Sequence, residues 1–337
     1  MTLEIIDDLN RLLEFEPAWS SFARTINDLT PFQLPAWLLT WWRHFGSGQL
    51  RVLVFREGDQ IAGVVPCFLH EWQGSHQMTL IGSGISDYLE PAISPECSSD
   101  VVAHLRAHLE ADPDWDVCNW QDLFSDSPLR SLASAVVDEA ECYVLALKGN
   151  FQEYWAARSK SLRQNVRRDR QKAELRAPLK FEVFTEADPE PLQALIQLHA
   201  ARWRKHGEAG MIDANRSTGF LNDIACEFAR RDMLRMFVLR FDGQIAAVIL
   251  AFQYAGTVFN YLNAFDPEHE TLGLGRALLC EAVRYSFEHG YRAWDFLRGN
   301  EPYKLWWGAG PVRKCRIIAT RTALCNRLSF SAHSSEF

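Results

Sequence analysis

The chain has 337 residues and a formal net charge of −8, with 47% hydrophobic and 23% charged residues. This length fits about two domains of roughly 150 residues each, and the composition is that of ordinary globular domains. The acidic balance argues against a surface that binds nucleic acid or anionic membrane as a whole. The eight cysteines show no C-x-x-C spacing and no zinc-finger histidines, so we expect free thiols in a reducing compartment and no metal site.

The first residues lack the basic flank and the long apolar stretch of a signal peptide. No run approaches the roughly 18 apolar residues that cross a bilayer. These features predict a cytoplasmic protein without a membrane span, and they leave its oligomeric state open.

An internal repeat links the two halves of the chain. Residues 51–68 return 184 positions later as residues 235–252, and eight of the 18 aligned pairs are identical. In each copy two short apolar runs flank a turn that contains Gly and Asp, which is the pattern of a β-hairpin. A repeat of this length predicts one domain used twice.

The elements that follow each hairpin come in the same order. A strand, an amphipathic helix and a second strand are predicted in both halves, and the helix of the second half starts near Leu274 and stops at Gly290. This order predicts an α+β fold, a mixed α/β sheet with a covering helix, in each of two tandem domains. We expect these domains at 1–147 and 148–322, followed by a flexible tail at 323–337.

A basic segment, residues 158–176, lies between the two halves. It holds eight Arg and Lys residues against two acidic ones, and Arg163 and Arg167 fall on one stripe of a predicted helix. One interpretation is a solvated amphipathic helix. The other is a wall that faces the phosphates of a cofactor or of a nucleic acid.

A second predicted helix carries His199 and Trp203 four residues apart. His199 is a candidate substrate contact, although a single helical histidine is also common at a surface or in a capped core position. The spacing alone does not decide between the two.

The loop L-G-L-G-R at 272–276 stands between a predicted strand and a predicted helix. Glycines at 273 and 275 let the backbone approach a ligand closely. The amides at a helix N-terminus suit a pyrophosphate, and Arg276 adds a charge-assisted contact. A tight turn into the helix explains the same glycines without a ligand, and the loop lacks the third glycine of a dinucleotide fingerprint.

Polar side chains cluster just beyond the last predicted strand, in D-F-L-R-G-N-E-P-Y-K at 295–304. Glu301 or Asp295 is a candidate to accept a proton from an attacking amine or hydroxyl, and Tyr303 is a candidate to donate one to a leaving group. Arg298 and Lys304 complete the cluster. The alternative is a local Asp295–Arg298 ion pair beside packing aromatic residues.

Together, the glycine loop before the helix and the tyrosine after the last strand make the second half resemble a GNAT-type acyltransferase domain. The resemblance is closer to the CelD/BcsL-like branch, which is similar to the Fem-type aminoacyl transferases. It is carried by an S-x-x-x-N-x-x-R element that contains Asn165, by His199 with Trp203, and by the 295–304 string. It covers roughly 150–320 well and 30–125 more loosely.

This resemblance implies an acyl-CoA donor, often acetyl-CoA, and no metal. The amides of Leu274, Gly275 and Arg276, with Gly273 at the turn, would hold the pyrophosphate. Backbone amides near Leu262, Asn263 and Ala264 would polarise the thioester carbonyl, and Tyr303 would protonate the leaving thiolate. The first half would be a degenerate copy without a cofactor loop, because its corresponding connection at 86–100 holds acids and prolines.

Three functions stay open at this point. The first is an acyl-CoA-dependent N- or O-acyltransferase that acts on a small-molecule or saccharide acceptor in polysaccharide or envelope synthesis. The second is a Fem-like transferase that uses aminoacyl-tRNA, favoured by the basic segment and by Glu270 where the superfamily loop begins with Gln or Arg. The third is a non-catalytic module that binds a sugar or nucleotide.

Overall fold

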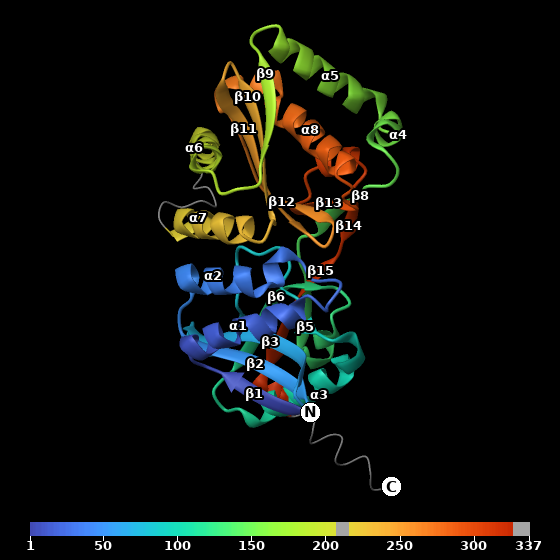
Figure 1. Cartoon of the computed structure of the whole chain (residues 1–337). Helices are drawn as coiled ribbons and strands as arrows, with labels where there is room; N and C mark the ends of the chain where they lie inside the picture. Colours follow the sequence, from blue (N-terminus) through green and yellow to red (C-terminus); the bar gives the residue numbers. More distant parts are fainter. Residues whose placement is uncertain (207–215, 326–337) are drawn as a thin grey trace. The chain divides into compact units, whose positions relative to one another are not determined.

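The computed structural model describes residues 1–206 and 216–325, without the side chains of residues 203–206. The chain divides into two compact units, and each has a sheet of its own (Figure 1). Unit 1 comprises residues 1–140 and the chain from 313 onwards, and unit 2 comprises residues 141–312. Part of the tail predicted at 323–337 lies outside the described residues.

Unit 1 contains the elements β1 (Thr2–Ile6), α1 (Leu9–Ala23), η1 (Pro31–Gln33), α2 (Pro35–Phe45), β2 (Gln49–Glu57), β3 (Gln60–Trp72), β4 (Ser75–Leu80), β5 (Ala92–Ile93), η2 (Pro95–Cys97), α3 (Ser98–Ala111), β6 (Val117–Phe124), η3 (Pro128–Leu132), β7 (Ala135–Asp138) and β15 (Lys314–Thr320). Unit 2 contains β8 (Cys142–Ala146), α4 (Phe151–Ala156), α5 (Lys160–Glu174), β9 (Leu179–Phe184), α6 (Pro189–His206), α7 (Arg216–Ala229), β10 (Leu234–Phe241), β11 (Gln244–Tyr254), β12 (Thr257–Phe265), η4 (Pro267–Leu272), α8 (Leu274–Glu288), β13 (Ala293–Arg298), α9 (Tyr303–Trp306) and β14 (Gly310–Val312).

The two sheets repeat one topology. Unit 1 has the strand order β1-β2-β3-β4-β6-β15-β7, and unit 2 has β9-β10-β11-β12-β13-β8-β14. In each sheet one pair is parallel, β4 with β6 or β12 with β13, and every other pair is antiparallel. The predicted order of hairpin, strand, helix and strand, and with it the mixed α+β fold, is confirmed in both units.

The repeat extends to the irregularities of the hairpins. Arg56 pairs with Ile61 in unit 1, Arg240 pairs with Ile245 in unit 2, and both registers shift immediately before these arginines. The bulge therefore falls at the same position of both copies, 184 residues apart. Such a shared bulge is a designed feature of the fold rather than a defect.

The sixth strand of each sheet is distant in sequence from the strands that it pairs with. β8, which precedes every other strand of unit 2, pairs with β13, whereas β15, which follows all of unit 2, pairs with β6 of unit 1. The backbone consequently passes from unit to unit at 140/141 and again at 312/313. The domain limits expected at 147/148 and 322/323 stay predictions.

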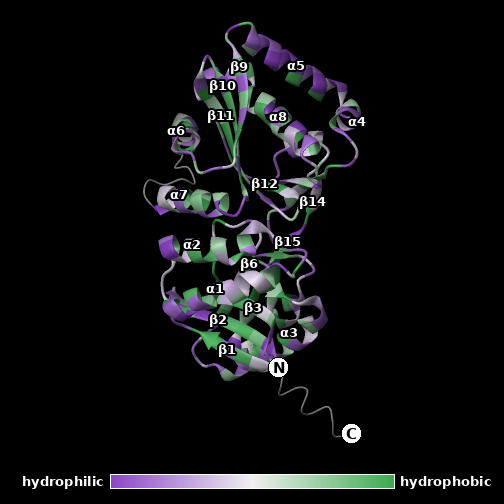
Figure 2. Cartoon of the chain, viewed as in Figure 1, coloured by the Kyte–Doolittle hydropathy of each residue, from purple (hydrophilic) through white to green (hydrophobic). Residues whose placement is uncertain are grey.

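One hydrophobic cluster of unit 2 lies between its sheet and α8. In Figure 1, α8 and α5 lie on one side of this sheet, and α6 and α7 lie on the other. Ala277, Leu278 and Ala282 of α8 are buried against Phe237 and Trp294 of the strands. Figure 2 shows the hydrophobic central strands and the largely hydrophilic α5, as the binary pattern of the sequence predicts.

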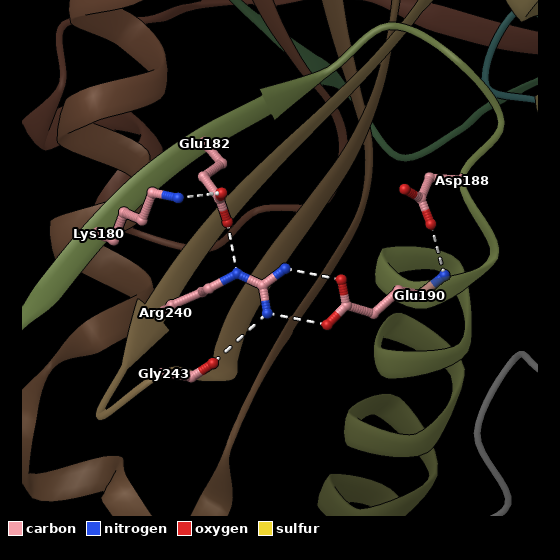
Figure 3. Close-up of polar contacts among 6 residues, drawn as sticks. All are labelled: Lys180, Glu182, Asp188, Glu190, Arg240 and Gly243. Atoms are coloured by element: carbon pink, nitrogen blue, oxygen red, sulfur yellow. Dashed lines mark hydrogen bonds and ion pairs between the residues drawn. The ribbon is translucent and has the colours of Figure 1, made fainter.

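A polar network ties β9, β10 and α6 together (Figure 3). The Arg240 guanidinium donates to both carboxylate oxygens of Glu190, at 2.8 and 2.7 Å, and to Glu182 on the adjacent strand. Lys180 donates to the other oxygen of Glu182 at 2.7 Å. Unit 1 repeats the strand-to-strand part, because Arg56 Nε lies 3.2 Å from Glu4 Oε2.

This network predicts a pH-dependent contribution to stability. Hydrogen bonds from Lys180 and Arg240 lower the pKa of Glu182. A carboxyl whose folded pKa is depressed contributes stability above its unfolded pKa of about 4.3, and this contribution is lost as the pH falls through the folded value. Glu182→Gln should therefore lower the free energy of unfolding by about 0.5–1 kcal/mol at neutral pH, the range of a partly exposed ion pair.

Urea unfolding of wild type and Glu182→Gln at about pH 7 and at a series of lower pH values measures this difference, which should shrink as the pH falls and the folded carboxylate takes up a proton. Glu186→Gln is the matched control, since this exposed carboxylate has no ion pair among the described residues. A difference that persists unchanged at the lower pH would contradict the electrostatic origin.

Candidate functional site

The sheet of unit 2 opens between β12 and β13. Their parallel pairing ends at Phe259 and Asp295. Beyond this point β12 continues along β11 as far as Phe265, while β13 continues along β8 through a break in register. Residues 260–265 therefore have no paired strand on the β13 side in the described structure. This segment contains Leu262, Asn263 and Ala264, the residues whose amides are predicted to polarise a carbonyl.

The end of β13 is held in an unusual conformation. Leu297 has φ +59°, in the left-handed region that a leucine rarely adopts. The buried Asp295 carboxylate accepts a hydrogen bond from the Leu297 amide at 2.7 Å and thereby fixes the turn. Strain of this kind persists only where the surroundings impose it, and it is common at functional sites.

Lys304 secures the same turn from the other side. Its ammonium is buried and donates to the carbonyls of Leu297, Arg298 and Gly299 at 3.0, 2.7 and 3.1 Å. It also lies 3.0 Å from Glu301 Oε2, whose side chain remains 56% exposed. With all its protons engaged, Lys304 can position the segment. Glu301, in contrast, reaches solvent, where an acceptor can approach.

Tyr303 stands beside this turn, near side chains of β13 and α6. Its ring contacts Phe296 of β13 edge to face, with centroids 5.9 Å apart. Burial raises the pKa of the Tyr303 hydroxyl, Glu301 raises it further, and Arg202 of α6 opposes both. Arg202 in turn lies over the Phe265 ring of β12, 5.0 Å from its centroid. The phenol is therefore protonated at neutral pH and can donate a proton.

The sequence did not single out Arg202, Phe265 or Asn260. Asn260, on β12 next to the opening, is 2% exposed, and its Oδ1 has no hydrogen-bond partner among the described residues. Such a buried acceptor is unusual in a native structure. An asparagine inside an apolar strand is the one signal that would have revealed it; Arg202 and Phe265 follow only from the fold.

His199 is placed in the interior rather than on the surface. It is 6% exposed on α6, one turn before Arg202. Burial, with a smaller contribution from Arg202, lowers the pKa of its imidazole, so it is neutral at neutral pH. The side chain of Trp203, its predicted companion, lies outside the described residues.

The glycine loop starts α8 as predicted, but one of the chain's own carboxylates lies against it. Gly273 has φ +65°, and a Cβ there would clash with Asp169 Oδ2 of α5. The same oxygen lies 2.7 Å from Arg276 Nη1, and Asp169 is 6% exposed. Lys172 also donates to the Thr271 carbonyl at 2.8 Å. The basic helix thus packs on the loop, and an internal anion pairs with the arginine that the sequence assigned to a pyrophosphate.

The remaining predicted residues are divided between two places. Arg298 lies in the turn that Lys304 secures, whereas Arg163 and Arg167 line a separate groove between α5 and α8. Asn165 is half-buried on α5. The described residues contain no cluster of three or more metal-ligating side chains.

The three hydrogen bonds that Lys304 donates predict a large loss of stability when this lysine is replaced. Lys304→Met removes the donor for three carbonyls and should cost about 3 kcal/mol of unfolding free energy, because breaking a buried charge network leaves its polar partners unpaired. Lys172→Met, which removes one hydrogen bond at an exposed site, should cost less than about 1 kcal/mol. Urea unfolding at neutral pH compares the two variants. Equal losses of unfolding free energy would show that the turn does not need the hydrogen bonds from Lys304.

Comparison with known proteins defines the class of the fold. Residues 160–305 match the family model described as an acetyltransferase (GNAT) domain. The fold of this part of unit 2 is therefore GNAT-like. The CelD/BcsL-like branch stays a prediction, and a search of curated proteins found no match.

Solved structures extend the likeness to both units. FemX aligns over 94% of this chain and 97% of its own, with a TM-score of 0.66 at 11% identity. The C-terminal domain (DUF2156) of a putative lysylphosphatidylglycerol synthetase from Agrobacterium fabrum aligns over 95% and 96%, with a TM-score of 0.58 at 12% identity. L-PGS from Bacillus licheniformis aligns over 92% of both chains, with a TM-score of 0.57 at 13% identity.

At these identities the likeness concerns the fold, which is that of two tandem GNAT-like domains. In the described parts of the chain, none of the helices has the length and apolar character needed to cross a membrane.

Proposed function

We propose that the protein transfers an acyl group from an acyl-CoA donor directly to an amine or hydroxyl acceptor, at the opening between β12 and β13. The observation that carries this proposal is the half-buried, protonated phenol of Tyr303 beside two strands that diverge after Phe259 and Asp295. The unpaired edge of β12 supplies backbone donors, the phenol supplies an acid, and the exposed Glu301 supplies a base.

The reaction needs no covalent enzyme intermediate. The acceptor nitrogen or oxygen attacks the thioester carbon, and its proton passes to Glu301. Amides of the Leu262–Ala264 segment that face the opening stabilise the negative charge on the carbonyl oxygen. The carbon–sulfur bond then breaks as Tyr303 protonates the leaving thiolate, and solvent returns the proton from Glu301 to the tyrosine.

The buried residues around this path hold the reactants in place. Asp295 and Lys304 fix the turn that carries Glu301 and Tyr303, so their role is positioning rather than proton transfer. The neutral His199 and the Arg202 guanidinium are suited to contact the acceptor. Holding both reactants in line provides a large part of the acceleration in such reactions. A saccharide acceptor agrees with the resemblance to the CelD/BcsL-like branch.

Tyr303→Phe tests the proposed acid. The substitution keeps the ring and its contact with Phe296, so kcat should fall about 100-fold while the donor Kd stays unchanged. Thiol release from acetyl-CoA, measured with water and with a panel of amino sugars as acceptors, gives the rate. Tyr285→Phe is the matched control, since Tyr285 packs on Phe237 of the core. An unchanged kcat in Tyr303→Phe would remove the tyrosine from the mechanism.

An aminoacyl-tRNA donor is the second candidate, and one contact favours it. Asp169 pairs with Arg276 beside Gly273. The acyl-CoA hypothesis places the pyrophosphate of coenzyme A at this position. The basic α5 then offers its arginines to a polynucleotide, and Fem-type transferases, to which the chain is similar, are associated with this donor. Both readings place the chemistry at the same opening.

Titration calorimetry with acetyl-CoA separates the two donors. If coenzyme A binds at the loop, wild type should bind it, Gly275→Asp should lose binding, and Asp169→Asn should bind about tenfold more tightly, because a competing carboxylate has been neutralised. Circular dichroism confirms that each variant is folded. Absence of binding by both wild type and Asp169→Asn, together with salt-dependent binding of tRNA, would transfer the assignment to aminoacyl-tRNA.

A further inference from the structure

A cavity lies in unit 2 under the basic helix α5. It has a volume of about 350 Å³ and lies between α5, α8 and the strands β9 and β10. This volume is at the lower end of the range of about 300–1,000 Å³ in which small-molecule sites fall. None of its lining residues belongs to the β12–β13 opening or to the loop at 272–276. The cavity therefore needs an explanation of its own.

The charges around this cavity are unbalanced. Four arginines line it, Arg163, Arg167, Arg170 and Arg284, against the single carboxylate of Glu281. Glu281 is already shared, since its two oxygens lie 2.5 Å from Arg170 and 3.0 Å from Arg284. Arg170 is satisfied further by Glu174 at 2.7 Å. Glu174 and Glu281 thus neutralise Arg170 and Arg284 only.

The other two arginines have no carboxylate partner among the described residues. Arg163 donates through Nε to the carbonyl of Arg158 at 3.2 Å and forms no ion pair. Arg167, one helical turn further along the same face, has neither a hydrogen bond nor an ion pair in the described structure. Two arginines four residues apart that line one cavity without a carboxylate partner can take up an anion, because guanidinium forks bind phosphate oxygens in pairs.

The opposite wall of the cavity is apolar. It is lined by Leu179 and Phe181 of β9, Leu239 of β10, Val166 of α5 and Ala277 of α8. Trp155 borders the cavity and stacks on Phe151, with ring centroids 5.7 Å apart. A free inorganic anion would leave this wall uncovered, so the ligand that fits carries an apolar or aromatic body beside its charge.

We propose that the α5–α8 groove binds a phosphate monoester whose body is apolar or aromatic, with the phosphate between Arg163 and Arg167 and the body on Leu179, Phe181 and Leu239. A phosphate monoester carries about −1.5 to −2 charges at pH 7 and matches two guanidinium groups, whereas a carboxylate offers one. The proposal assigns a ligand to the basic stripe of α5 and does not depend on the acyl-transfer reaction.

The body of such a ligand has two sources, a nucleoside or an acyl-glycerol. Titration calorimetry of the full chain with adenosine 5′-monophosphate and with monomeric dihexanoyl phosphatidic acid distinguishes them. Inorganic phosphate serves as the probe for the charge alone. At least one ester should bind, and it should bind at least tenfold more tightly than inorganic phosphate, because only the ester covers the apolar wall.

A matched pair of double variants locates the binding. Arg163→Gln with Arg167→Gln should weaken binding of the ester at least tenfold, and raising the salt concentration should weaken binding to wild type. Lys160→Gln with Arg176→Gln removes the same charge from the same segment outside the cavity, so binding should change less than twofold. Thermal unfolding of each variant without ligand verifies that both are folded.

Three results would overturn the proposal. The first is that neither ester binds the wild-type chain. The second is that inorganic phosphate binds as tightly as the esters, which would show that the apolar wall contributes nothing. The third is that the two double variants lose binding equally, which would show that only the overall charge of the helix is sensed. Because none of these measurements requires turnover, their outcome is independent of the proposed transfer reaction.

Discussion

The rest of each unit depends on one constraint, the irregularity near the end of β6 in unit 1 and of β13 in unit 2. In both sheets a parallel pair is followed by a bulge with one residue in the left-handed region, Asp122 in unit 1 at φ +58° and Leu297 in unit 2 at φ +59°. A buried lysine holds each bulge. Lys314 lies 2.6 Å from the Asp122 carboxylate, and Lys304 donates to the carbonyl of Leu297. The geometry repeats, although the lysines come from different parts of the chain.

What surrounds the bulge differs between the two units, in the way that the proposed function requires. In unit 1 the Lys314 ammonium also donates to the Asp87 carbonyl at 2.9 Å, and the neighbouring Ser86 and Tyr88 are buried. Burial raises the pKa of Glu90 to about 7 in the same loop. Side chains therefore fill the space beside this bulge. In unit 2 the corresponding bulge is followed by an exposed Glu301 and a protonated Tyr303. Both are groups that can act on a substrate.

The sequence was sufficient for the repeated hairpins and for the order of elements, because those follow from local periodicity and from the identity of the two copies. It could not predict which strands β8 and β15 pair with. β8 and β15 are five and seven residues long, and their partners lie about 150 and 190 positions away, so no local pattern links them. The Asp169–Arg276 pair escaped for the same reason, because its two residues are 107 positions apart.

The ion pair of Asp169 also changes how the two glycines of the loop are understood. Gly273 is required by the chain itself, since its φ is positive and a Cβ would meet the Asp169 carboxylate. A glycine is expected at that position whether or not a ligand binds. Gly275 is different, because it lies within an ordinary helix start and a Cβ there would stand 3.2 Å from the Phe265 ring, a contact that a shift of a few tenths of an ångström relieves. Packing explains Gly275 only in part. A ligand contact at Gly275 therefore stays a prediction, whereas the glycine at 273 is explained by the fold alone.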